Sequence, residues 1–172
     1  DEFMFAIKNA IENGYSISIG GDVSESGYSS THDVAMIPSY DIPSEYIDGI
    51  GKICRKNNIL MIADEVTTGV GRTGKFAYSQ SFSEKPDILC MGKAISAGHY
   101  PVAVTLVNEK IVDAWDKLEE QGVPFSKIHR RGNSITGTQE ACALGLKVLE
   151  IIERDNLIQQ VNERGKYALE KL

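Results

Sequence analysis

Residues 59–93 read ILMIADEVTTGVGRTGKFAYSQSFSEKPDILCMGK, and this stretch decides the expected fold. It begins with a short apolar run, residues 59–63, of the kind that forms a strand buried on both faces of a sheet. A second run of this kind covers residues 88–91. Ligands of parallel α/β sheets bind beyond the carboxyl ends of the strands. Because the first run ends in Asp64 and Glu65 and the second ends just before Lys93, we expect an acid and an amine at one sheet edge, facing one ligand.

The flanking sequence predicts helices on either side of these strands. Ser44 stands where a helix cap belongs, and isoleucines follow at helical spacing before the basic residues Arg55 and Lys56. After Lys93 the patterns predict a small-residue loop at 94–101, a buried strand at 102–107, and further helices at 140–154 and 157–172. Between that strand and these helices, Asn108 caps a predicted helix that carries four apolar residues inward: Ile111, Val112, Trp115 and Leu118. Residues 1–13 have an amphipathic helical pattern, and residues 15–19 alternate as a strand does. The chain is therefore expected to be α/β, with a mostly parallel sheet, flanking helices and a short helix-strand segment in front.

Two motifs in this order resemble the class III aminotransferases. They are DEVTTGVGRTGK at residues 64–75 and PDILCMGKA at residues 86–94, and the resemblance runs from about Gly49 to the end of the chain. That family uses pyridoxal 5'-phosphate (PLP) on the fold-type I scaffold, so residues 49–172 are expected to form part of its large domain. The resemblance implies four roles. Asp64 would pair with the pyridine nitrogen, Val66 would pack on the ring, Thr67 would approach the phenolic oxygen, and Lys93 would carry the Schiff base.

The chemistry of PLP is consistent with these roles. A carboxylate beside the ring nitrogen keeps that nitrogen protonated, so that the ring can take up electrons from the substrate. A lysine forms the Schiff base and can move a proton between two carbons once a substrate amine displaces it. Considered alone, Asp64 is more simply interpreted as a helix cap or a surface carboxylate, and Lys93 as a solvated lysine, which most lysines are. The spacing of the two motifs favours the functional interpretation.

The loop GNSITGTQ at residues 132–139 occupies the place of a third motif of this family. Members of the family usually have Thr-aromatic-Ser-Gly-Asn-Pro here, and the leading Thr binds the PLP phosphate held by the other subunit of a dimer. Ser134 matches that Thr and keeps a hydroxyl group, which implies a cofactor contact and a homodimer. Ile135, Thr138 and Gln139 depart from the pattern, so an ordinary loop leading into a helix remains the alternative.

Residues 1–48 resemble a different family. The sequence GGDVSE at residues 20–25, with DIPS at 41–44, is similar to a segment of papain-like cysteine peptidases of the bleomycin-hydrolase type. His32 does not match that family's motif and no cysteine precedes Cys54, so we expect a segment without catalytic residues. We divide the chain into residues 1–48 and 49–172, with the boundary between Pro43 and Gly51. A natural fusion, a chimera and a misassembled reading frame remain open as its origin.

Several other function classes are disfavoured. Residues 69–74 fit the dinucleotide pattern G-x-G-x-x-G, and residues 69–75 fit the start of a P-loop. The first lacks its direct strand-to-helix context, and in the second Phe76 replaces the hydroxyl residue that binds magnesium. A formal net charge of −6 argues against nucleic acid or a membrane surface as partner. The three cysteines and three histidines are scattered, which indicates reduced thiols, a cytoplasmic location and no metal centre.

The expected function is PLP-dependent transamination between an amine or amino acid and a keto acid or aldehyde. The sequence shows no Ser/Gly-rich phosphate loop, no ring-stacking aromatic residue and no small domain of the kind found in the resembling enzymes. We therefore expect impaired activity in this chain. A catalytically silent fragment, or a fusion with the peptidase-like segment, is the alternative. The residues that would select the small-molecule donor and acceptor are not identifiable.

Overall fold

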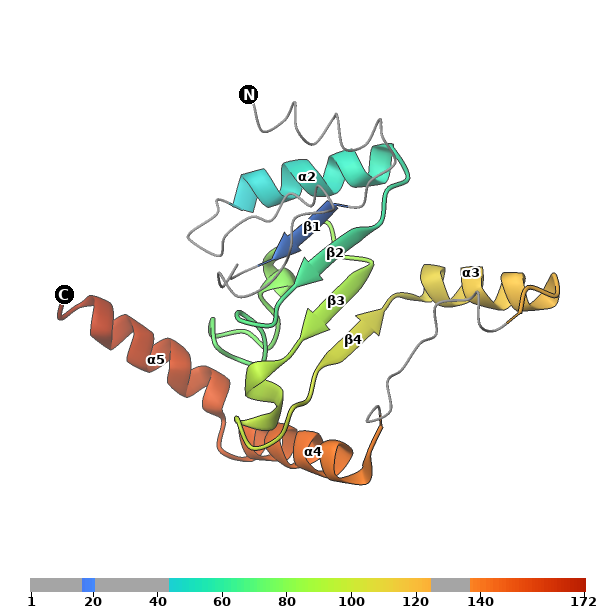
Figure 1. The fold of residues 1–172 in the computed structure, drawn as a ribbon. Helices are drawn as coiled ribbons and strands as arrows, with labels where there is room; N and C mark the ends of the chain where they lie inside the picture. Colours follow the sequence, from blue (N-terminus) through green and yellow to red (C-terminus); the bar gives the residue numbers. More distant parts are fainter. Residues whose placement is uncertain (1–16, 21–43, 125–136) are drawn as a thin grey trace, which may run out of the picture.

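In the part of the chain that the structure describes, four strands form one mixed sheet (Figure 1). The computed structural model describes residues 17–20, 44–124 and 137–172. The strand order is β1-β2-β3-β4, in which β1, β2 and β3 are parallel and β4 is antiparallel to β3. The elements in chain order are β1 (Ile17–Gly20), α2 (Ser44–Lys56), β2 (Met61–Asp64), the 3-10 helix η1 (Tyr78–Ser81), β3 (Ile88–Met91), the 3-10 helix η2 (Lys93–Ser96), β4 (Val104–Val107), α3 (Glu109–Glu120), α4 (Gln139–Arg154) and α5 (Leu157–Leu169).

This arrangement confirms the predicted α/β class with a mostly parallel sheet. The alternating pattern at residues 15–19 corresponds to β1, which pairs with β2 in parallel. The helix expected at residues 1–13 lies outside the described residues. Residues 94–96, expected as part of a small-residue loop, instead belong to η2.

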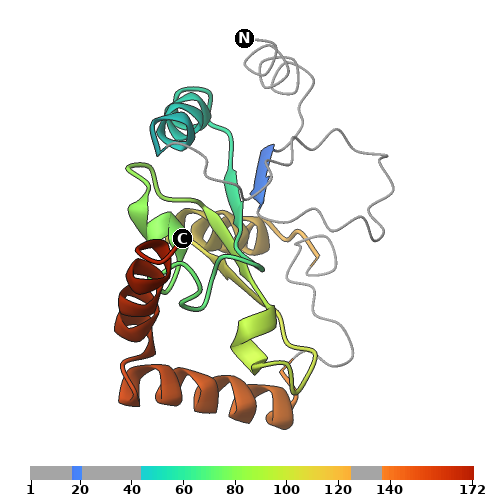
Figure 2. The ribbon, with the colours of Figure 1, turned by 90° about the vertical axis from the view of Figure 1, so that its left-hand side faces the viewer.

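Helix α2 covers one face of the sheet, as Figures 1 and 2 show. Its apolar positions follow the 3.6-residue period, so they form one stripe that packs inward. The resulting core consists of Ile47, Ile50, Cys54, Met61 and Phe82, each at most 6% exposed. Fully burying an aliphatic side chain stabilises a fold by roughly 1.5–3 kcal/mol, so this cluster fixes α2 on the sheet.

Strand β2 is buried on only one of its faces. Met61 and Ala63 are buried, whereas Ile62 and Asp64, which point the other way, are half-exposed. The expectation of a strand buried on both faces was therefore wrong, because α2 packs on the face of Met61. Strand β4, also expected to be buried, has exposed residues at its centre, and Leu106 is 49% exposed.

Helix α4 packs beneath η2 and forms a second core. Val70, Ala77, Met91 and Ile95 are buried there, and the α4 side chains Leu149 and Ile152 pack against them. These four buried residues come from the glycine-rich loop, the entry to η1, the end of β3 and η2. One cluster therefore ties the segments around Lys93 to helix α4.

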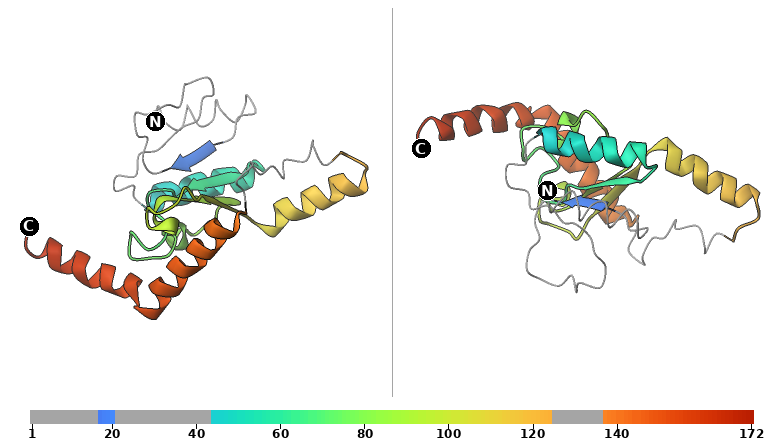
Figure 3. Two further views of the ribbon diagram at one scale, coloured as in Figure 1. Left: turned by 60° about the horizontal axis from the view of Figure 1, so that its bottom comes forward. Right: turned by 90° about the horizontal axis from the view of Figure 1, so that it is seen from above.

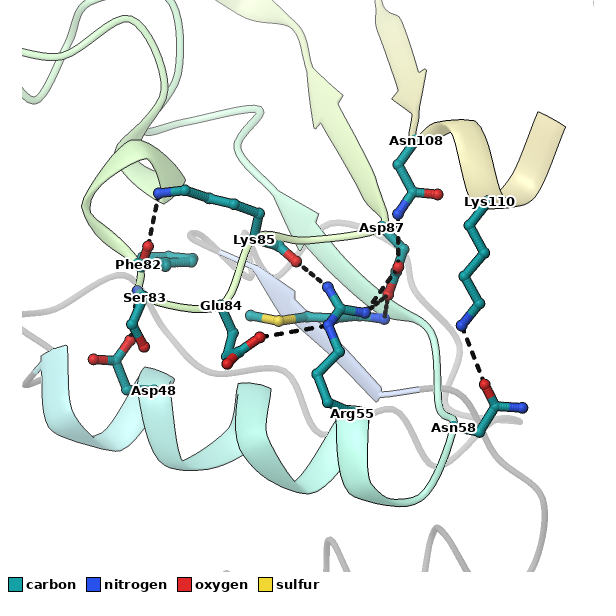
Figure 4. Close-up of polar contacts among 11 residues, drawn as sticks. Asp48, Arg55, Asn58, Phe82, Ser83, Glu84, Lys85, Asp87, Asn108 and Lys110 are labelled. Atoms are coloured by element: carbon teal, nitrogen blue, oxygen red, sulfur yellow. Dashed lines mark hydrogen bonds and ion pairs between the residues drawn. The ribbon is translucent and has the colours of Figure 1, made fainter. Parts of the chain in front are cut away.

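A buried carboxylate joins several segments at the start of β3 (Figure 4). Asp87, directly before β3, is 1% exposed. It accepts hydrogen bonds from Arg55 of α2 at 2.7 and 2.9 Å, from the N–H of Met61 at 2.8 Å and from Nδ2 of Asn108 at 2.7 Å. Burial acts to raise the pKa of Asp87, but these hydrogen bonds and the Arg55 charge together hold that pKa below its usual value.

Helix α3 begins as predicted but does not pack inward along its length. The Asn108 side chain caps it by accepting from the N–H of Ile111 at 3.2 Å. Of its apolar residues, Ile111 is buried and Trp115 half-buried, whereas Val112 and Leu118 are exposed. The prediction that all four point inward was wrong, because α3 extends away from the sheet beyond β4 (Figure 3).

Neither a membrane span nor a metal cluster is found in the described parts of the chain. No helix there has the length and apolar character needed to cross a bilayer. No three His, Cys, Asp or Glu side chains there lie close enough together to hold a metal ion.

Candidate cofactor site

Asp64 and Lys93 lie at the same edge of the sheet. Asp64 is the last residue of β2, and its register partner on β3 is Cys90. Lys93 lies two positions after the end of β3 and begins η2. The structure therefore brings an acid and an amine to the carboxyl ends of two neighbouring parallel strands, the position at which ligands of such sheets bind.

Lys93 has an unusual backbone and a positioned amine. Its φ of +47° places it in the left-handed region, which costs a non-glycine residue about 1–3 kcal/mol. Backbone strain of this kind is most often retained at functional sites. The side chain is exposed, and its Nζ donates a hydrogen bond to Oγ1 of Thr67 at 2.8 Å. The residue predicted to contact the phenolic oxygen therefore holds the lysine amine.

Asp64 and Val66 are set by the turn that follows β2. Oδ1 of Asp64 accepts a hydrogen bond from the N–H of Val66 at 3.1 Å, and the Asp64 side chain is half-exposed. Val66 packs over the backbone before the lysine, where a Cβ on Gly92 would lie 3.3 Å from its Cγ1. A larger residue at position 92 would push Val66 away, so Gly92 permits this close contact.

Cys90 lies between Asp64 and Thr105 in one row across the sheet. Its register partners are Asp64 on β2 and Thr105 on β4. Burial raises the pKa of the Cys90 thiol, and the Asp64 charge raises it further, against a hydrogen bond with Thr105 that acts to lower it. This thiol therefore stays protonated at neutral pH.

The glycine-rich loop after Thr68 packs against α5. Nδ2 of Asn162 donates to the carbonyl of Gly74 at 2.8 Å, and a Cβ on Gly74 would lie 1.9 Å from Oδ1 of Asn162. The loop leads into η1, a 3-10 helix of four residues. A dinucleotide fingerprint requires a helix directly after its glycines, so the geometry agrees with the sequence argument against such a site.

The sequence places Glu65 next to Asp64, but we did not predict from it that the Glu65 side chain points into the protein. The two carboxylates do not face the same ligand, because Glu65 points inward and is only 3% exposed. The strand alternation that puts Asp64 on the half-exposed face puts its neighbour on the other face, and this signal could have separated them.

Ser134 lies outside the described residues, so its predicted phosphate contact stays a prediction. Thr138, four positions later, is the N-cap residue of α4, with φ −60° and ψ 145°. Its Oγ1 is buried and has no hydrogen-bond partner among the described residues.

Comparison with known proteins gives a family. The family model Aminotransferase class-III matches residues 39–172. An adenosylmethionine-8-amino-7-oxononanoate aminotransferase from Methanocaldococcus jannaschii is 39% identical over 135 residues, covering 76% of this chain and 28% of the relative. An ornithine aminotransferase from Oceanobacillus iheyensis is 36% identical over 130 residues, covering 76% of this chain and 30% of the relative.

A solved structure extends the likeness to the fold. A PLP-bound amine transaminase from an uncultivated Pseudomonas species superposes with a TM-score of 0.67 at 38% identity. That alignment covers 79% of this chain and 29% of the other. The chain thus spans less than a third of the length of each of these three proteins. The family match includes residues 39–48, while the predicted division at residue 49 and the peptidase resemblance of residues 1–48 stay predictions.

Proposed function

This chain belongs to the class III aminotransferase family, and from that premise we propose that it takes part in PLP-dependent transamination. An amino group would pass between an amine or amino acid and a keto acid or aldehyde. The observation that carries the proposal is the pair formed by Lys93 and Thr67, held at 2.8 Å at the sheet edge where Asp64 also ends its strand.

The described residues fit the family's cofactor, PLP. An exposed lysine amine suits covalent attachment to an aldehyde, and a half-exposed carboxylate suits a protonated ring nitrogen. Asp64 ends β2 and Lys93 lies just beyond the end of β3, and these two adjacent strands are in register at Asp64 and Cys90. When bound, PLP supplies an electron sink for the bonds broken at the substrate carbon.

Each residue has a distinct proposed role. Lys93 would hold the cofactor covalently through its amine and would also serve to move a proton at the substrate carbon. Thr67 orients the Lys93 amine through their hydrogen bond. Asp64 holds a proton on the pyridine nitrogen, and its Oδ1 is oriented for this by the N–H of Val66. The Val66 side chain, fixed over Gly92, offers an apolar surface to one face of the ring.

We also propose that the working protein is a cytoplasmic homodimer, with Ser134 contacting the phosphate held by the partner subunit. The free cysteines Cys54, Cys90 and Cys142 support a reducing location.

Positioning of reacting groups is worth roughly 7–11 kcal/mol in favourable cases. A site holding only the groups described above would forfeit much of this, so we expect the chain alone to show no turnover clearly above that of free PLP.

Equilibrium binding of PLP tests the assignment of the site. We expect saturable binding by the wild type, and at least tenfold weaker binding by Lys93→Ala and Asp64→Asn. Lys75→Ala is the matched control, since the exposed amine of Lys75 bonds to Ser81 at 2.7 Å, and its binding should equal that of the wild type. Equal affinities for all four proteins would contradict the proposed site.

Turnover is measured separately, with a panel of amines and detection of the keto product. The expected rate of the wild-type chain equals that of free PLP. Faster product formation that disappears in Lys93→Ala would show that the chain alone is a competent transaminase.

A further inference from the structure

Glu65 is a buried carboxylate next to Asp64 that the proposed mechanism does not use. It is 3% exposed, and Oε1 accepts a hydrogen bond from the N–H of Ser79 at 2.7 Å. Oε2 accepts a second hydrogen bond from the N–H of Tyr78. These are the first two N–H groups of η1, which have no partner within their own helix. Glu65 therefore caps η1 from a position 13 residues away in sequence.

The backbone of Glu65 is equally constrained. Its N–H donates to the carbonyl of Cys90 on β3 at 2.8 Å, and its carbonyl accepts from the N–H of Gly69 at 2.8 Å. One residue thus joins the end of β2 to β3, to the glycine-rich loop and to η1. Buried hydrogen bonds of a carboxylate are among the stronger kinds in proteins, because the acceptor is charged.

The direction of Asp64 depends on this arrangement. Successive side chains of an extended chain point to opposite faces, so holding Glu65 inward holds Asp64 on the half-exposed face. The turn from Asp64 to Val66 then starts from a fixed backbone.

From these contacts we infer that Glu65 is a positioning residue of the cofactor site: by capping η1 it aims Asp64 at the ring nitrogen. This inference rests on the proposed function, because it takes Asp64 to be the partner of that nitrogen. Glu65 itself would touch neither the cofactor nor the substrate.

The test reads the environment of the ring nitrogen in a covalent adduct. The chain is incubated with PLP and reduced with borohydride, which converts the imine to a stable secondary amine, so that the pyridoxyl group stays attached to lysine during the titration. The absorbance of this adduct is then titrated with pH to give the pKa of its pyridine nitrogen. The variants are Asp64→Asn, Glu65→Gln and, as a matched control, Glu84→Gln, which alters a half-exposed carboxylate between η1 and β3 that pairs with Arg55 at 3.6 Å. Urea unfolding of each adduct measures stability in parallel.

We expect the wild-type adduct to hold its nitrogen proton to higher pH than free reduced pyridoxyl-lysine, and Asp64→Asn to lose this shift. Glu65→Gln should lose at least half of it, because an amide presents an N–H to the two donors of η1 and leaves the turn misaligned. Glu84→Gln should match the wild type. A purely structural role of Glu65 would lower the urea midpoint of Glu65→Gln and leave the pKa of the nitrogen unchanged.

The outcomes separate the two claims. A wild-type adduct without a raised pKa would overturn the role of Asp64, and the proposed function with it. A raised pKa that is lost in Asp64→Asn and retained in Glu65→Gln would leave that function standing and overturn the role of Glu65. If Glu65→Gln does not fold, Glu65→Asp is titrated instead. Its carboxylate is one methylene too short to reach η1, so a wild-type pKa in that variant would equally overturn the inference.

Discussion

Replacing Asp87 by alanine removes one buried carboxylate that three elements share. In the wild type Asp87 accepts hydrogen bonds from Arg55, from the N–H of Met61 and from Asn108 (Figure 4). Asp87→Ala leaves the N–H of Met61, a residue only 1% exposed, without an acceptor. It also separates the end of α2 and the start of α3 from the start of β3, the strand that leads to Lys93.

The size of the loss in stability depends on which hydrogen-bond partners of Asp87 water can reach in the variant. A buried donor left unpaired costs about 1–3 kcal/mol, and this applies to the N–H of Met61. The Arg55 side chain is 35% exposed, so water can solvate its charge once Asp87 is removed. The lost ion pair between Arg55 and Asp87 therefore adds at most about 1 kcal/mol. We therefore expect Asp87→Ala to lower the free energy of unfolding by about 1–4 kcal/mol.

Urea unfolding followed by circular dichroism measures this loss. Asp113→Ala, which removes an exposed carboxylate of α3, is the control and should change the free energy of unfolding by less than about 0.5 kcal/mol. The reasoning would be refuted if the two variants lost the same free energy.

The pH dependence of the same difference follows from the lowered pKa of Asp87. A carboxyl whose folded pKa lies below its unfolded value contributes stability above that unfolded pKa, about 3.9, and loses it as pH falls through the folded pKa. The stability difference between wild type and Asp87→Ala should therefore be constant from about pH 7 to about pH 5 and shrink below about pH 4. A difference that grew on acidification would contradict the charged state assigned to Asp87.

Three further outcomes are expected. Thr67→Val removes the hydrogen bond to Lys93 and should weaken PLP binding several-fold while changing the free energy of unfolding by less than about 1 kcal/mol; equal PLP affinity would count against the pair. Gly74→Ala, at φ +77° and facing Asn162, should cost about 1–3 kcal/mol in urea unfolding, and less when Asn162→Ala is also present; full additivity would refute the contact. Cys54 is fully buried and burial raises its pKa, so iodoacetamide should label it far more slowly in buffer than in urea, and rapid native labelling would contradict its placement.

The sequence alone was sufficient to predict the elements that carry the site. The apolar runs at 59–63 and 88–91 correspond to β2 and β3, and the polar residues that follow them meet at one sheet edge. The amphipathic pattern ending at Arg55 and Lys56 corresponds to α2. Such predictions succeed because periodicity and strand ends are local properties of the chain.

The contacts that hold the site in place could not be predicted in the same way. Asp87 joins Arg55 and Asn108, which lie 32 and 21 positions from it in sequence, and Asn162 reaches Gly74 across 88 positions. No local pattern indicates such pairings, because they depend on how the helices pack. The left-handed backbone of Lys93 is likewise set by its surroundings, since a lysine has no preference for that conformation.

The burial of apolar side chains on α3 was also predicted wrongly from the helical periodicity. Val112 lies at helical spacing from Trp115, and Leu118 from Ile111, yet Val112 and Leu118 are exposed on α3. An apolar stripe predicts that a helix has something to pack against, but not whether the described part of the chain supplies it.

Peptide mapping after reduction tests the central claim most directly. The chain is saturated with PLP, reduced with borohydride, digested and analysed by mass spectrometry for the pyridoxyl group. We predict one dominant label on Lys93, because its amine lies at the same sheet edge as Asp64 and is oriented by Thr67. A label on Lys75, or one spread evenly over the exposed lysines, would contradict it.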